Sequence, residues 1–286
     1  MTTDAAYERC REIARSEARN FYYGFVLLPP ERRAAIYAAY AFSRRADDSV
    51  DGMDSPQDKL AAVAARRQEL DAVMSGDVPP GDPVLVALAD AVRRFRIPRE
   101  PLDALLDGVA MDLTTQRYAD WGALEEYCAR VAGAVGVVSL HIFGFSDPAA
   151  PGYARELGIA LQIVNIMRDV AEDAARGRIY LAQADLAAHA VEEEAILAGV
   201  PTPGFRALMA DYRGRAEDLF RRGERLLPLL DLRARMCVCM LESLYREILN
   251  GIVARDYDVF AGRVALSTPR KLALMGQSTL SSLTSR

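Results

Sequence analysis

Strand-like patterns are nearly absent from this sequence, which limits the folds open to it. Runs in which β-branched apolar residues alternate with polar ones do not appear. Alanine, leucine, arginine and glutamate, which favour helices, dominate instead. With 286 residues, of which 51% are hydrophobic, the chain can bury a large core. No linker or internal repeat is evident, so we predict an all-α fold with a single domain over residues 1–286.

The predicted helices follow one another with short loops between them. They cover residues 29–51, 57–74, 83–96, 100–112, 121–145, 151–175, 191–197, 205–227 and 229–255. Segments 76–81 and 199–204, rich in glycine and proline, are expected to be loops. Segments 131–145 and 157–167 are apolar nearly all round, which is typical of central, enclosed helices. Their small residues would allow close packing or leave space for a cavity: Gly133, Ala134, Gly136, Gly158 and Ala160. The first of these segments is too short to span a bilayer.

The composition excludes several kinds of site. Only two histidines occur, His141 and His189, which rules out a histidine-rich metal site and disfavours Ser-His-Asp or Cys-His mechanisms. The four cysteines form no CxxC pair, so we expect free thiols in a reducing cytoplasm. The net charge of −5 disfavours nucleic-acid binding. No secretory signal pattern is visible at the N-terminus, and we expect a cytoplasmic protein.

Two pairs of carboxylates stand out in the predicted helices. Asp47 and Asp51 lie four residues apart, as do Asp169 and Asp173, so each pair shares one helix face. Asn165 extends the second stripe by one turn. Like charges at this spacing repel, and a shared cation would relieve the repulsion. Oxygen ligands without histidine or cysteine suit a hard ion such as Mg²⁺, with Mn²⁺ as an alternative.

Arginines lie close to both pairs in the sequence. They are Arg44, Arg45, Arg168, Arg176 and Arg178. These side chains either balance local charge or, together with Mg²⁺, bind a diphosphate, because guanidinium groups match phosphate oxygens in pairs.

Three motifs resemble those of the squalene/phytoene synthase family, the trans head-to-head prenyl synthases. They read YAFSRRADDSVDG at 40–52, YCARVAGAVG at 127–136 and LGIALQIVNIMRDVAEDAARGRIYL at 157–181. The resemblance extends over residues 18–271 and is strongest to bacterial presqualene diphosphate/squalene synthases or phytoene synthases. It implies a class I isoprenoid synthase fold, a helical bundle around a central cavity.

The resemblance also implies roles for individual residues. Those implied to bind metal are Asp47, Asp51, Asn165, Asp169 and Asp173. Those implied to bind the substrate are Arg19, Tyr40, Arg44, Gln162, Asn165, Arg168, Arg178, Tyr245, Arg263 and Lys271. Tyr127 and Tyr180 are implied to be catalytic, together with the four aspartates. The chain departs from the family at three positions where many members have histidine, serine or proline: Glu17, Asn20 and Ala182.

The implied activity is a Mg²⁺-dependent 1′-1 condensation of two prenyl diphosphates through a cyclopropylcarbinyl diphosphate. Segments 20–23 and 135–144 favour two C15 farnesyl diphosphates, with presqualene diphosphate or squalene as the product. One alternative is a phytoene synthase that uses two C20 geranylgeranyl diphosphates. NADPH would be needed only for squalene, and no dinucleotide-binding fingerprint supports it.

Two other classes of protein fit the sequence less well than this enzyme. A non-catalytic relative that acts as an assembly factor would be expected to lose carboxylates from one motif, whereas both pairs are intact. A terpene cyclase or head-to-tail prenyl synthase is disfavoured by the motif at 127–136. The oligomeric state stays open. Peripheral contact with a membrane is inferred only from the hydrocarbon nature of the product.

Overall fold

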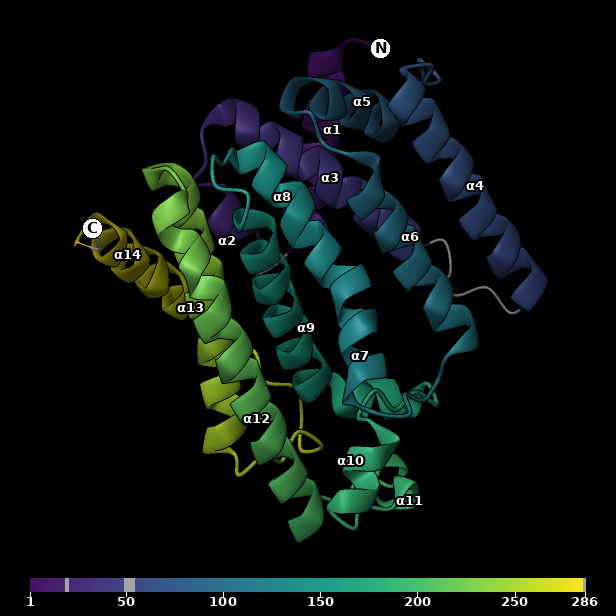
Figure 1. Ribbon diagram of the computed structural model, residues 1–286, viewed down its shortest axis with the longest axis vertical. Helices are drawn as coiled ribbons and strands as arrows, with labels where there is room; N and C mark the ends of the chain where they lie inside the picture. Colours follow the sequence, from purple (N-terminus) through teal and green to yellow (C-terminus); the bar gives the residue numbers. More distant parts are fainter. Residues whose placement is uncertain (19–20, 49–54, 285–286) are drawn as a thin grey trace.

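The computed structural model describes residues 1–18, 21–48 and 55–284 (Figure 1). These residues form α1 (Thr3–Glu17), α2 (Phe21–Phe25), α3 (Pro30–Asp48), α4 (Pro56–Ser75), α5 (Pro83–Phe95), α6 (Arg99–Thr114), α7 (Trp121–Cys128), the π-helical turn η1 (Ala129–Gly133), α8 (Ala134–Phe143), α9 (Ala150–Ala175), α10 (Gln183–Ala188), α11 (Glu193–Leu197), α12 (Pro203–Gly223), the 3-10 helix η2 (Glu224–Leu229), α13 (Leu232–Ala254) and α14 (Thr268–Thr284). Within the described ranges the only β contact is an isolated bridge between Arg117 and Ile179. The all-α prediction is confirmed.

Most predicted helices are present, and the differences have local causes. The helix expected over 121–145 is interrupted by η1 and ends before Gly144, whose φ of 81° leaves the helical region. The helix expected over 205–227 ends at Gly223 and continues as η2, which contains Pro228. Four helices were not predicted: α1, α2, α10 and α14. The end of the helix expected over 29–51 lies outside the described residues.

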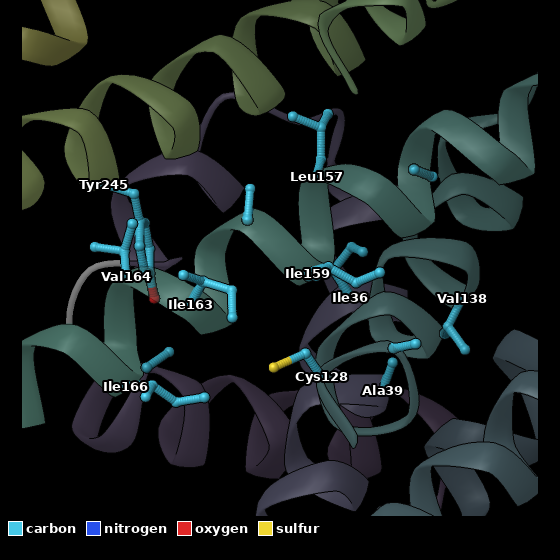
Figure 2. Close-up of a cluster of buried hydrophobic side chains, with 14 of the residues drawn as sticks. Ile36, Ala39, Cys128, Val138, Leu157, Ile159, Ile163, Val164, Ile166 and Tyr245 are labelled. Carbon is cyan, nitrogen blue, oxygen red and sulfur yellow. The ribbon is translucent and has the colours of Figure 1, made fainter. Parts of the chain in front are cut away.

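Helix α9 occupies the centre of the bundle. It packs against α8, α12, α13 and η1, and in Figure 1 it lies between α8 and α13. Its buried side chains include Ile159, Ile163 and Ile166, which belong to the core cluster drawn in Figure 2. The same cluster contains Ile36 of α3 and Tyr245 of α13. The second acidic motif, at the C-terminal end of α9, is therefore held by a helix with neighbours on several sides.

Glycines let α9 approach its neighbours closely. A Cβ on Gly158 would lie 2.4 Å from the carbonyl oxygen of Ala132 in η1. A Cβ on Gly136 in α8 would lie 2.4 Å from the carbonyl oxygen of Ala154 in α9. Both glycines also line the cavity described below. Gly136 and Gly158 therefore have both predicted effects: they permit close packing of the helices and leave space for the cavity.

Gly158→Ala is expected to lower the free energy of unfolding by about 3 kcal/mol, because a methyl group would be forced against backbone atoms of η1. Urea denaturation followed by circular dichroism measures the change. Gly152→Ala is the matched control on the same helix, since a Cβ there meets nothing within 4 Å. Equal stability of the Gly158→Ala variant and wild type would contradict the close packing.

Segment Trp121–Phe143 is long and apolar enough to cross a membrane by length and composition alone. The prediction that residues 131–145 are too short concerns the apolar run without α7, and the addition of α7 supplies the extra length. Half of its apolar window is buried inside the bundle, where η1 and α8 pack against α6 and α9. This burial is what a core helix requires.

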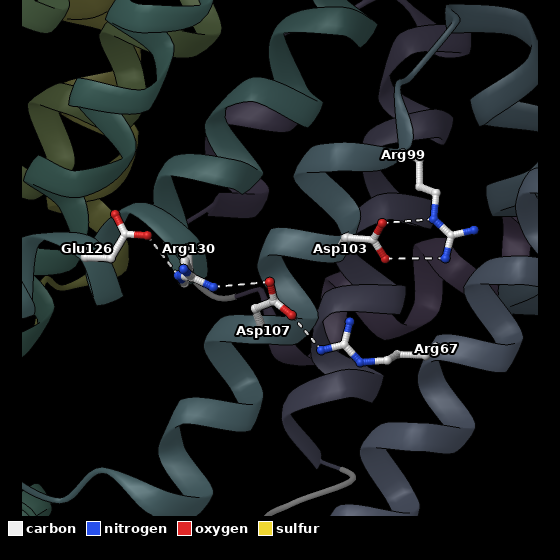
Figure 3. Close-up of polar contacts among 6 residues, drawn as sticks. All are labelled: Arg67, Arg99, Asp103, Asp107, Glu126 and Arg130. Carbon is white, nitrogen blue, oxygen red and sulfur yellow. Dashed lines mark hydrogen bonds and ion pairs between the residues drawn. The ribbon is translucent and has the colours of Figure 1, made fainter.

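Ion pairs connect the outer helices near η1 (Figure 3). Asp107 of α6 accepts from Arg67 of α4 at 2.5 Å and from Arg130 of η1 at 3.1 Å. Arg130 also pairs with Glu126 at 2.9 Å. All four side chains are more than a third exposed, so each pair contributes at most about 1 kcal/mol. Apolar packing, rather than these pairs, holds the bundle together.

Candidate active site

A largely apolar cavity of about 250 Å³ lies inside the bundle. Side chains of α2, α3, α6, η1, α8, α9, η2 and α13 line it. Along α9 the lining residues extend from Ala154 to Asn165, a distance of about 16 Å at 1.5 Å per residue. Valine, leucine, alanine, glycine and phenylalanine make up most of the wall. The shape and chemistry suit a long hydrocarbon chain.

Polar groups gather at one end of this cavity. Asp47 is the last lining residue of α3, and Gln162 and Asn165 are the last ones of α9. The Asn165 amide nitrogen donates to Gln162 Oε1 at 3.3 Å, while Asn165 Oδ1 is buried without a hydrogen-bond partner. A buried orphaned oxygen is costly unless a ligand or ion completes it. The structure therefore brings together three of the residues singled out in the sequence.

Two further predicted residues lie next to Asp47 on α3. Tyr40 lines the cavity, and burial raises the pKa of its phenol to about 12, opposed by the positive charge of Arg44. Arg44 pairs with Asp48 at 2.5 Å, and its Nε is buried without a partner. Its guanidinium is thus only partly satisfied by the protein.

Asp169 and its arginines form a compact cluster one turn beyond Asn165. Arg168 donates to both carboxylate oxygens of Asp169, at 2.7 and 2.5 Å. Arg263, from the segment after α13, donates to the same two oxygens at 2.9 and 3.1 Å. Residues 94 positions apart in the sequence are thereby joined. These two predicted phosphate-binding arginines lie at the second acidic motif, where they neutralise its first carboxylate.

Asp173 lies two turns beyond Asn165, beside Arg178 and Tyr180 in a small hollow. Burial raises the pKa of the Asp173 carboxyl to about 7, and repulsion from Asp169 adds to the rise. Arg176 and Arg178 oppose it. Its ionised form is thus disfavoured in the protein alone and would gain from a nearby cation.

Asp173 is expected to make wild type less stable as the pH rises. Its pKa is higher in the folded chain than in the unfolded one, so the folded state binds more protons between pH 4 and 7. Without metal, Asp173→Asn should therefore be more stable than wild type, by about 1 kcal/mol or more, and the difference should grow from pH 5 to pH 8. Paired urea titrations at both pH values measure it. A difference that shrinks as the pH rises would contradict the burial of this charge.

A network of phenols surrounds Asp112 at the end of α6. Tyr127 donates to Asp112 Oδ2 at 3.1 Å, and Tyr180 donates to Asp112 Oδ1 at 2.9 Å. The two rings stack with centroids 5.3 Å apart. Burial, followed by the nearby Asp112 charge, raises the pKa of both phenols. The two predicted catalytic tyrosines are therefore held together by one carboxylate.

Asp112 and Tyr118 were missed in the sequence. Tyr118 stacks on Tyr180, and its hydroxyl is buried without a hydrogen-bond partner. Asp112 lies in the last turn of α6, where a negative charge opposes the helix dipole. An acid at the C-terminal end of a helix is unfavourable unless a tertiary contact compensates for it. This position was the one signal in the sequence that could have indicated a role for Asp112.

Of the remaining predicted residues, the structure describes Tyr245 and Lys271. Tyr245 is buried, and burial raises the pKa of its phenol, opposed by Arg168 and Asn165. Lys271 lies 5.4 Å from the ring centre of Tyr23. Arg19 and Asp51 lie outside the described residues.

The donor atoms at the polar end are carboxylate and amide oxygens. Among the residues that the structure describes, no group of three or more histidine, cysteine, aspartate or glutamate side chains could hold a metal ion. Two observations nevertheless fit a hard cation. Such a cation would give the orphaned Asn165 Oδ1 a partner, and it would favour the ionised form of Asp173, whose pKa is raised.

Comparisons with known proteins agree with this geometry. The family model for squalene/phytoene synthase matches residues 14–270. The phytoene synthase of Mycobacterium tuberculosis is 40% identical over 284 residues, which is 98% of this chain and 93% of the relative. The 15-cis-phytoene synthase of Synechococcus elongatus is 40% identical over 279 residues, 93% of this chain and 90% of the relative.

Solved structures agree as well. A dehydrosqualene synthase superimposes with a TM-score of 0.91 at 30% identity, over 99% of this chain and 98% of the other. A squalene synthase from Alicyclobacillus acidocaldarius superimposes with a TM-score of 0.84 at 31% identity, over 90% of this chain and 96% of the other. The resemblance, the fold class and the assignment as an enzyme are confirmed. The chain belongs to the squalene/phytoene synthase family, prenyltransferases that join prenyl diphosphates head to head.

Proposed function

We propose that this chain condenses two molecules of geranylgeranyl diphosphate into a C40 hydrocarbon of the phytoene type. The observation that carries the proposal is the 40% identity to phytoene synthases over more than nine tenths of the chain. These relatives favour the C20 alternative over the C15 preference drawn from segments 20–23 and 135–144. The dehydrosqualene and squalene synthases among the solved structures are less similar in sequence, at 30% and 31% identity.

The cavity accounts for how such a substrate would bind. Its apolar length along α9 would hold the isoprenoid chains and exclude water from them. Arg44, Arg168, Arg178 and Arg263 would bind the diphosphate at the polar end, with Tyr40 and Gln162 lining the approach. Tyr245 is buried outside the lining. Mg²⁺, or Mn²⁺ as an alternative, held by Asp47, Asp51, Asn165, Asp169 and Asp173, would supply charge neutralisation of the leaving diphosphate.

In the first half of the reaction, the C1–O bond of one donor breaks and the diphosphate leaves with the electron pair. The double bond of the second donor attacks the allylic cation, and loss of a proton closes a cyclopropane ring. We propose that Tyr127 or Tyr180 accepts this proton. Both phenols donate to Asp112, so a phenol oxygen can take the proton from the substrate while its own proton passes to the carboxylate. Tyr127 lies one turn before Val131, which lines the cavity.

In the second half, the cyclopropylcarbinyl diphosphate loses its diphosphate and rearranges to the 1-1′ linked cation. Loss of another proton gives the alkene, a step that requires no reductant. NADPH is therefore not expected to change the yield of the C40 product.

The test is incubation of the full chain with geranylgeranyl or farnesyl diphosphate and Mg²⁺, with and without NADPH, followed by mass spectrometry of the lipid extract. A C40 alkene from geranylgeranyl diphosphate, abolished by EDTA, is expected. Condensation of farnesyl diphosphate alone would overturn the C20 assignment. No condensed product from either donor would overturn the whole proposal.

A further inference from the structure

An ionisable side chain lies in the cavity wall away from the acidic motifs. Glu242 of α13 lines the cavity and is only 7% exposed. It precedes Tyr245 by three residues, or about 4.5 Å along the helix axis. Its neighbours in the lining include Val238 and Leu241 of the same helix and Leu226 of η2. A carboxyl group in such a wall is costly unless partners outside the cavity hold it.

Those partners are found on the outer side of the wall. Arg246, one turn later on α13, donates to Glu242 Oε1 through Nε at 2.8 Å. The same guanidinium donates to Glu224 of η2 at 2.5 Å and lies 4.6 Å from the ring centre of Phe220 in α12. One arginine therefore ties together α13, η2 and α12.

Burial changes steeply across this cluster. The Glu242 side chain is 9% exposed, whereas those of Arg246 and Glu224 are 36% and 40% exposed. Glu242 thus belongs to the cavity and its two partners to the surface. Leu226, two residues after Glu224, lines the cavity again. The three polar side chains form a single layer between the cavity and bulk water.

Each of the two carboxyl groups changes the protonation of the other. Burial raises the pKa of Glu242 to about 8, and a hydrogen bond with Glu224 adds to the rise. The same hydrogen bond lowers the pKa of Glu224, with Arg246 and Arg221 acting in the same direction. The protonated form of Glu242 and the ionised form of Glu224 are therefore favoured, and Arg246, which donates to both, bridges them.

We propose that Glu242, Arg246 and Glu224 determine the product by sealing this wall of the cavity against water. The inference rests on the proposed carbocation chemistry. If water enters, its oxygen adds to the cation and it releases a proton, so an alcohol forms in place of the alkene. The carboxyl of Glu242 is held by partners outside the cavity, which distinguishes this role from that of a base acting on the substrate.

The readout is the ratio of alcohol to hydrocarbon among the condensed products, which loss of folded protein does not change. Arg246→Met keeps an apolar stem near Phe220 but removes the link between the two glutamates. We expect the ratio to rise by about tenfold. Arg213→Met is the matched control: it breaks an Arg–Glu pair of similar exposure with Glu217 on α12, at 2.7 Å, away from the cavity lining. Its ratio should equal that of wild type.

A pH series on wild type supplies a second measurement that needs no destabilising variant. Above pH 8 both glutamates are ionised and repel each other, so the ratio should rise between pH 7 and pH 9. Glu224→Gln removes one of the two charges and should flatten that rise. A wild type that makes hydrocarbon, with ratios unchanged in Arg246→Met and across the pH series, would overturn the seal alone. If wild type forms no condensed product, both the proposed function and the seal are overturned.

Discussion

Replacing Asp169 with asparagine is expected to lower the rate of hydrocarbon formation by about a thousandfold. Asp169 is the carboxylate on which Arg168 and Arg263 converge, one turn beyond the orphaned oxygen of Asn165. The substitution removes the charge that positions both guanidinium groups and that would help to hold the cation. Both losses act on the departure of the diphosphate. Initial rates with geranylgeranyl diphosphate, at saturating Mg²⁺, measure the effect.

Helix α9 offers a matched control for that substitution. Glu156 accepts two hydrogen bonds from Arg222, as Asp169 does from each of its arginines, but it lies outside the cavity lining. Glu156→Gln should leave the rate within about twofold of wild type, because it breaks only a partly exposed pair. The helical circular dichroism signal should be unchanged in both variants. A nearly normal rate in Asp169→Asn would contradict the assignment of the second acidic motif to the active site.

Asp112→Asn is expected to lower kcat by about a hundredfold with little change in KM, because general acid–base groups contribute on this scale and Asp112 lines no part of the chain-binding cavity. An asparagine keeps the shape but cannot take the proton that Tyr127 or Tyr180 passes on. Steady-state kinetics over a pH series measure the loss. The effect should appear in the step that forms the cyclopropylcarbinyl diphosphate.

A second phenol–carboxylate pair separates this role from simple stabilisation. Tyr7 of α1 donates to Asp90 of α5 at 2.9 Å, away from the cavity lining. Asp90→Asn should cost comparable stability, about 1–2 kcal/mol, and leave kcat unchanged. Equal effects of the two substitutions on kcat would show that Asp112 only supports the fold.

The helices that could be predicted are those whose apolar faces are long and regular. Helix α9 begins one residue before its predicted start, because Pro151 lies in its first turn, where proline is favoured. Its interior was predictable because apolar residues recur along it from Leu157 to Val170. Helix α1 was missed because its buried stripe consists of Ala6, Cys10 and Ala14, which give a weak apolar signal. The π-helical turn η1 has no local signature, since apolar residues flank it on both sides. It depends on tertiary contacts such as that of Gly108 with Val131.

The site was predictable where spacing along one helix carried the information. Spacing along the helix singled out Asn165, which does line the cavity together with Asp47, whereas Gln162, which also lines it, was implied only by the family resemblance. The Tyr127–Asp112–Tyr180 network joins positions that are 15 and 68 residues apart, which no spacing rule links. No spacing rule links Arg246 and Glu242 to Glu224 either, because their association depends on how α13 packs against η2.

The donor used by the enzyme can be read from a single competition experiment. The full chain would receive equal amounts of farnesyl and geranylgeranyl diphosphate with Mg²⁺ and no NADPH, and the condensed hydrocarbons would be separated by mass. A predominant C40 alkene joined 1-1′ is the predicted result. A predominant C30 product, or only head-to-tail products, would contradict head-to-head condensation of two C20 donors.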